Sequence, residues 1–160
     1  MDPKTQLQYF RKEHQDIYRL LGQFGAALDL IHSQQDELRR KGIGKLRELQ
    51  ADLQAVQHHC DSEERSLESP YDAYLKRHQL ETLRQEHERL GRLTQGIVAE
   101  LQFATTNQTD NIFVRGQQWA QFVREHIAFE ETLLMEIENG LAAHGAQLPS
   151  AEKREADLLV

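Results

Sequence analysis

Four segments of this 160-residue chain repeat apolar residues at alternating spacings of three and four, the pattern of an α-helix that buries one face. The four apolar stripes run from Leu7 to Ile31, from Leu46 to Leu67, from Leu80 to Leu101 and from Ile112 to Leu141. Turn-forming residues separate them at Lys41-Gly42-Ile43-Gly44, at Ser69-Pro70 and in the polar run 105–110. Short connections between long amphipathic helices predict an all-α protein, an antiparallel up-down four-helix bundle.

The ends of the last helix set the expected limits of this domain. Thr109 or Asp110 is expected to cap its start and Gly145 to end it. We therefore expect one domain over residues 1–147. Residues 148–160 form a charged tail that is predicted to be either disordered or a short docking helix.

Composition and charge exclude several classes of protein. The net charge of −7 argues against a nucleic-acid partner, because phosphate binding requires a basic face. No apolar run approaches the roughly 18 residues that a membrane span needs, and residues 1–14 lack the apolar core of a signal peptide. A single cysteine, Cys60, fits a reducing compartment. We expect a cytoplasmic protein without a membrane or nucleic-acid partner.

Polar residues interrupt all four stripes. Each stripe contains one histidine, and two of them add a glutamate one turn later; the six residues are His14, His59, Glu63, His87, His126 and Glu130. Buried, unpaired glutamates are costly unless they become neutral or meet a cation. No lysine or arginine lies on the stripes at this level. A metal centre explains the pattern best.

An internal repeat strengthens this interpretation. The pair Glu13-His14 recurs as Glu86-His87, and residues 59–67 share the pattern HxxxEExxL with residues 126–134. Two similar helical hairpins predict a pseudo-twofold core with two equivalent metal positions. Residues four apart on a helix lie on one face, about 5–6 Å from each other.

Each HxxxE pair can therefore place its histidine on one metal and its glutamate as a bridge between both, while His14 and His87 complete the ligand set. Imidazole and carboxylate ligands suit iron or manganese, and zinc is less natural here.

The pattern H…HxxxE…H…HxxxE resembles the hemerythrin-like, or HHE cation-binding, family of non-heme di-iron proteins, over roughly residues 8–143. The resemblance implies a four-helix bundle with an oxo- or hydroxo-bridged pair of iron ions. It also implies reactivity toward oxygen, nitric oxide or peroxide. The six polar residues match the family's ligand positions one by one.

Gly91 stands where the oxygen-carrying hemerythrins have a further histidine, and Tyr18 is its partner in the repeat. On this resemblance both metals keep an open position, as in the subgroup with iron–sulfur-cluster repair proteins and catalase-like proteins. Gly91 either leaves room for a small ligand or accommodates a bulky neighbour such as Trp119. Tyr18 is expected to face the core, where it fills the bundle or donates a hydrogen bond to a bound oxygen species. Cys60 either packs the core or is open to oxidation beside the metals.

Three functions follow as hypotheses. The first is an enzyme that consumes peroxide or reduces other small oxidants, with a redox partner. The second is a protein that binds or senses oxygen, nitric oxide or iron without turnover, including repair of iron–sulfur clusters. The third is a helical interaction module that binds zinc or no metal. Oxidative-stress defence is the setting that the resemblance favours.

Overall fold

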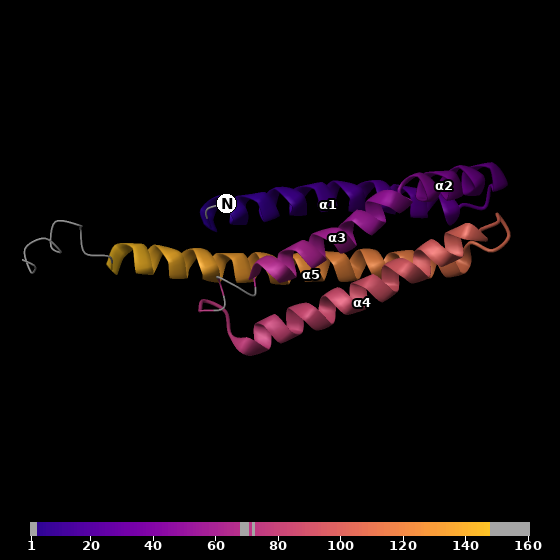
Figure 1. Ribbon diagram of the computed structural model, residues 1–160. Coiled ribbons are helices and arrows are strands. Elements are labelled where there is room, and N and C mark those ends of the chain that lie inside the picture. The colour runs from indigo at the N-terminus through magenta and orange to yellow at the C-terminus, as the bar shows by residue number, and fades with distance from the viewer. Residues whose placement is uncertain (1–2, 68–70, 72, 148–160) are drawn as a thin grey trace, which may run out of the picture.

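The computed structural model describes residues 3–67, 71 and 73–147, and all of its regular structure in these ranges is helical. Figure 1 shows long helices running alternately in opposite directions, as predicted for an up-down bundle. The helices are α1 (Pro3–Ile31), α2 (Asp36–Glu48), α3 (Gln50–Leu67), α4 (Arg77–Gln102) and α5 (Asp110–Gln147). The bundle's second arm consists of α2 and α3, so the prediction of an all-α four-helix bundle is confirmed.

The prediction for the first turn is wrong. Lys41-Gly42-Ile43-Gly44 lies inside α2, and the chain turns earlier, between Ile31 and Asp36. Gly42 is buried against α1, where an added Cβ would lie 2.7 Å from Ile31 Cγ2 and 2.8 Å from the Ile31 backbone nitrogen. The glycine therefore serves a close contact between two helices and does not break one. The second arm instead bends at Leu49, between α2 and α3.

The other boundaries lie nearer to their expected places. The run 105–109 is non-helical and α5 begins at Asp110. Gly145 does not end α5, which continues to Gln147. Ser69-Pro70 and the tail 148–160 lie outside the described residues.

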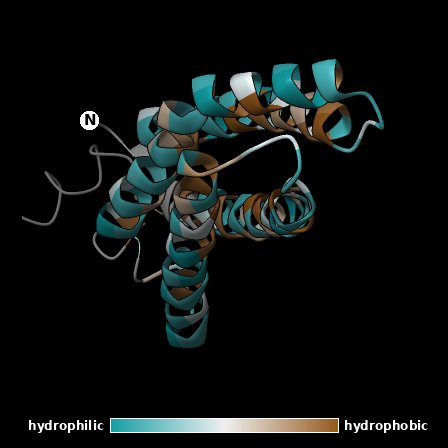
Figure 2. Cartoon of the chain, turned by 90° about the vertical axis from the view of Figure 1, so that its right-hand side faces the viewer, coloured by the Kyte–Doolittle hydropathy of each residue, from teal (hydrophilic) through white to brown (hydrophobic). Residues whose placement is uncertain are grey.

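Two apolar clusters fill the bundle, and a polar layer separates them. On α1, Phe10 belongs to the smaller cluster and Ile17 to the larger one, with His14 between them. The same order recurs on the other three helices, with Leu67 and Val56 on α3, Leu83 and Leu90 on α4, and Leu133 and Val123 on α5. Figure 2 shows hydrophobic ribbon turned toward neighbouring helices and hydrophilic ribbon on the outer sides. Apolar packing on both sides thus fixes the height at which the polar residues meet.

None of the helices within the described residues carries an apolar stretch long enough to traverse a lipid bilayer.

Candidate metal centre

The structure brings the six polar stripe residues together at one level of the bundle. His14 comes from α1, His87 from α4, and α3 and α5 each supply a histidine with a glutamate one turn later. All six are buried: the two glutamates are 0% exposed and the four histidines between 1% and 6%. Each helix places its histidine inward because it continues the apolar stripe of that helix.

The four imidazoles form two pairs. The rings of His14 and His59 lie 5.1 Å apart between centroids, and those of His87 and His126 lie 4.8 Å apart. Each pair joins one helix of the EH type to one of the HxxxEE type, as the repeat predicts. The pairs therefore define two neighbouring places where a cation could be held.

Glu130 faces both pairs with different oxygens. Its Oε1 lies 3.0 Å from His87 Nε2 and 2.7 Å from His126 Nε2. Its Oε2 lies 3.2 Å from His14 Nε2 and 4.0 Å from His59 Nε2. This is the position of a carboxylate that could bridge two metal ions.

Glu63 faces the first pair. Its Oε2 lies 3.6 Å from His59 Nε2, and its Oε1 lies 4.0 Å from His14 Nε2. Potential ligand atoms of His14, His59, Glu63 and Glu130 all lie within 4.8 Å of one another, close enough to surround a single ion.

A ring of outer carboxylates holds the other side of each imidazole. Every one of the four histidines directs Nδ1 to a glutamate on a neighbouring helix: His14 to Glu131 at 2.6 Å, His59 to Glu13 at 2.9 Å, His87 to Glu64 at 3.3 Å and His126 to Glu86 at 2.8 Å. An Nδ1–H that donates to a carboxylate leaves Nε2 with a free lone pair, and this fixes the ring for metal ligation.

The ring follows the internal repeat. The glutamate of each EH pair serves the histidine of an HxxxEE helix, and the second glutamate of each HxxxEE motif serves the histidine of an EH helix. From the sequence, Glu64 and Glu131 could either face solvent or orient the ligand histidines, and the structure agrees with the second alternative. The roles of Glu13 and Glu86 were missed. The shared EH dipeptide was the signal that could have found them.

The inward-facing atoms are suited to bind a cation. Among the described residues, the buried side-chain atoms without a hydrogen-bond partner include Nε2 of His14, His59 and His126, both carboxylate oxygens of Glu63, and Oε2 of Glu130. Leaving several buried polar atoms unsatisfied at one place is costly. Positive ions between the two histidine pairs would satisfy all of them. Imidazole nitrogens and carboxylates are a donor set that suits iron, manganese or zinc.

Comparison with known proteins agrees with this geometry. The family model described as "Hemerythrin HHE cation binding domain" matches residues 5–137. The chain belongs to the hemerythrin family. The comparison with curated proteins and the comparison with solved structures gave no match. Together with the cluster of histidines and glutamates, the family establishes a metal-binding, hemerythrin-like protein.

The electrostatics of this hemerythrin domain are those of a centre that holds protons when metal is absent. Burial and the neighbouring Glu130 carboxylate raise the pKa of Glu63 well above its ordinary value. Burial would lower the pKa of His126, but the side chains of Cys60 and Glu130 outweigh it and raise that pKa to about 12. Burial likewise lowers the pKa of His87, but Cys60 and Glu130 outweigh it and raise that pKa to about 9. Metal ions must displace these protons, so acid weakens metal binding.

The prediction that Tyr18 faces the core is wrong. Its side chain is 47% exposed, and Ile17 is buried in its place. Both lie about one turn from His14, but the buried face of α1 continues through Ile17 and Leu21. Position 18 therefore falls on the outer side of the helix, and Tyr18 does not take part in the polar layer.

Gly91 also lies beside the stripe, since the buried residue next to it is Leu90. A Cβ at Gly91 would lie 2.9 Å from Gln57 Oε1, so the Gln57 side chain from α3 occupies the space next to this glycine. Of the two interpretations, accommodation of a neighbouring side chain agrees with the structure, although the neighbour is Gln57 and not Trp119. Trp119 instead donates a hydrogen bond to Thr94 Oγ1 at 2.9 Å.

A surface cavity of about 350 Å³ between α1 and α3 reaches the first histidine pair. Its wall includes His59 and the outer carboxylate Glu13, together with Asp16, Arg19 and Asp52 near its mouth. The cavity therefore brings solvent up to His59 and Glu13, at the outer side of the first histidine pair.

Proposed function

We propose that this hemerythrin-family protein holds two iron ions and uses them to bind or consume a small oxidant such as hydrogen peroxide, nitric oxide or oxygen. One iron would be held by His14 and His59 and the other by His87 and His126, with Glu63 and Glu130 shared between them. The observation that carries the proposal is Glu130, whose two oxygens face different histidine pairs.

The donor types support iron. Four imidazoles and two carboxylates match the ligands that iron and manganese accept, whereas zinc sites in proteins are mostly tetrahedral and mononuclear. Such a pair of ions supplies redox chemistry and a Lewis-acidic place where a small molecule binds. The protein holds the ligand nitrogens in position through the outer glutamates and keeps the centre in an apolar surrounding.

Access supports a small reactant. The cavity beside His59 is the path that we infer for it, and its charged wall admits water and polar molecules. Glu13 lies on this wall and accepts a hydrogen bond from His59 Nδ1, so this carboxylate links the cavity to a histidine of the centre. We infer that peroxide or nitric oxide reaches the centre from this side.

A second candidate is a protein that binds oxygen, nitric oxide or iron without turnover, for sensing or for iron–sulfur-cluster repair. The same centre and the same cavity serve both candidates. We propose a cytoplasmic location for the protein in either case, and a separate redox partner for the enzyme.

The deciding experiment mixes iron-loaded protein with peroxide, nitric oxide or oxygen and follows the optical spectrum and the loss of the reactant. The enzyme proposal expects repeated consumption of peroxide, or of nitric oxide when a reductant is present. A spectral change that saturates at one molecule per centre, without further consumption, would favour the binding protein. Glu130→Ala is the control, because it should abolish both responses.

A further inference from the structure

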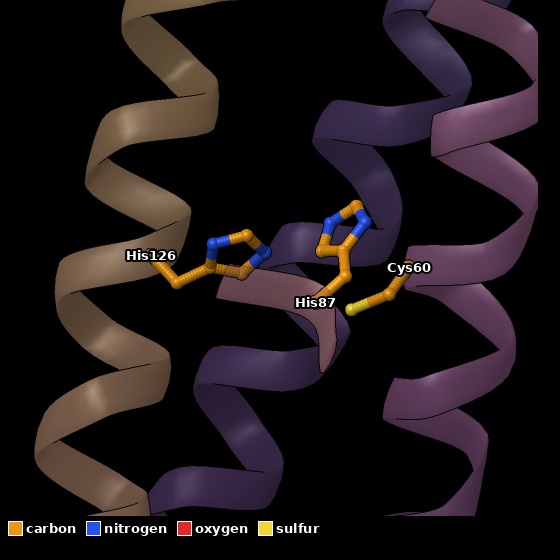
Figure 3. Close-up of side chains that lie close together, drawn as sticks. All are labelled: Cys60, His87 and His126. Atoms are coloured by element: carbon orange, nitrogen blue, oxygen red, sulfur yellow. The ribbon is translucent and has the colours of Figure 1, made fainter. Parts of the chain in front are cut away.

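Cys60 directs its sulfur into the polar layer on the side of the second histidine pair. Potential ligand atoms of Cys60, His87 and His126 all lie within 4.8 Å of one another. Figure 3 shows the thiol extending from α3 toward the two imidazoles. The three residues are 0%, 2% and 2% exposed, so bulk water does not separate them.

The thiol makes the two halves of the centre unlike. Its partner in the repeat is Ile127, a buried side chain without a metal-binding atom. The group of atoms around the first pair consists of nitrogen and oxygen donors alone, from His14, His59 and the two glutamates. Within the described residues, the cysteine sulfur is grouped with the second pair and not with the first.

A second observation points to an ion between these side chains. His126 is buried and its Nε2 has no hydrogen-bond partner, although Glu130 Oε1 lies only 2.7 Å away. A buried cysteine often only fills space in a core. Space filling, however, does not account for a thiol and two imidazoles that converge on one place.

We propose that Cys60 is a ligand of the metal ion held by His87 and His126, so that this ion has one sulfur donor and the other ion has none. The inference rests on the metal centre of the proposed function and deepens it. On binding, the bond from Sγ to hydrogen is replaced by a bond from Sγ to the metal, and the proton leaves to solvent. A metal-bound thiol is deprotonated for this reason.

The thiolate would make the two ions chemically different. The first histidine pair is grouped with oxygens of Glu63 and Glu130, whereas the second pair is grouped with sulfur. The surface cavity is lined by His59 of the first pair. The thiolate would therefore tune the ion whose histidines do not line this cavity.

Cobalt(II) tests the assignment directly, because a thiolate ligand gives it an intense charge-transfer band in the near ultraviolet. Metal-free, reduced protein is titrated with cobalt(II) while that band and the weaker visible bands are recorded. We expect the visible bands to saturate at two cobalt ions per chain and the thiolate band at one. In Cys60→Ser the thiolate band is lost and one cobalt binds at least about tenfold more weakly, because losing a ligand costs no less than losing one of its hydrogen-bond partners.

Ile127→Val is the matched control, since it alters the equivalent core position and should keep the thiolate band. If Cys60→Ser does not fold, Cys60→Ala and the wild-type spectrum still decide the question. Two bound cobalt ions without a thiolate band would overturn the role of Cys60 and leave the proposed metal centre intact. A folded wild-type chain that binds no cobalt would overturn the metal centre itself.

Discussion

The ring of outer carboxylates makes a quantitative prediction at Glu86. This residue is the acceptor for His126 Nδ1 at 2.8 Å, and its side chain is 30% exposed, so removing it opens no large cavity in the core. Glu86→Ala frees the ring of His126 to rotate and lowers the basicity of its Nε2. Loss of such a partner typically weakens metal binding by about 10- to 100-fold, or about 1.4–2.7 kcal/mol.

Glu86→Gln separates charge from hydrogen bonding. The amide oxygen still accepts from Nδ1–H but carries no negative charge, so we expect a smaller loss than in Glu86→Ala. The assay is a competition titration of the metal-free protein with cobalt(II) and a chelator. Glu88→Ala is the matched control, because Glu88 lies two residues away on α4 and its ion pair among the described residues is with exposed Arg92 at 3.7 Å. Equal affinities for Glu86→Ala and Glu88→Ala would refute the role of the outer ring.

Three further predictions concern the shared carboxylate, pH and the helix contact. Glu130→Ala should lose more metal than His14→Ala, because Glu130 faces both histidine pairs and His14 only one; elemental analysis that shows the reverse would contradict this. The raised pKa of His87 means that the metal-free fold keeps a proton there that the unfolded chain loses above pH 6.5. The free energy of unfolding from urea titrations should therefore fall as the pH rises toward about 9, by up to about 3 kcal/mol from this group, and should fall less in the metal-bound protein. Gly42→Ala should lower the free energy of unfolding by about 1–3 kcal/mol, because the new Cβ meets the backbone of Ile31, whereas an unchanged urea midpoint would mean that α2 moves freely.

The candidate centre was visible in the sequence because its residues violate a strong pattern. A histidine or glutamate on an apolar stripe is either buried or ends the helix, and the continuing stripes on both sides excluded the second outcome. His14, His59, His87 and His126 therefore had to meet at one level, between apolar residues that the same spacing placed above and below. The fold followed from the same periodicity.

The errors arose where the sequence leaves two physical readings open. Gly42 is compatible with a turn or with a close helix contact, and only the position of Ile31 on the neighbouring helix decides between them. On a helix, the residues three and four places after a histidine both lie on nearly the same face as the histidine. Whether Ile17 or Tyr18 is buried therefore depends on how α1 packs against the neighbouring helices. The partners of Nδ1 are contacts between helices. The repeated EH dipeptide draws attention to Glu13 and Glu86, but the sequence does not say which histidine each of them meets.

The number of metal ions bound per folded chain tests the central claim most directly. Metal-free protein is reconstituted anaerobically with iron(II), freed of unbound iron and analysed for iron and protein content, with helical structure checked by circular dichroism. We predict two iron ions per chain in the wild type and fewer than one in Glu130→Ala. A helical wild-type protein that retains no iron, or an iron content that Glu130→Ala leaves unchanged, would contradict a dinuclear centre built on His14, His59, Glu63, His87, His126 and Glu130.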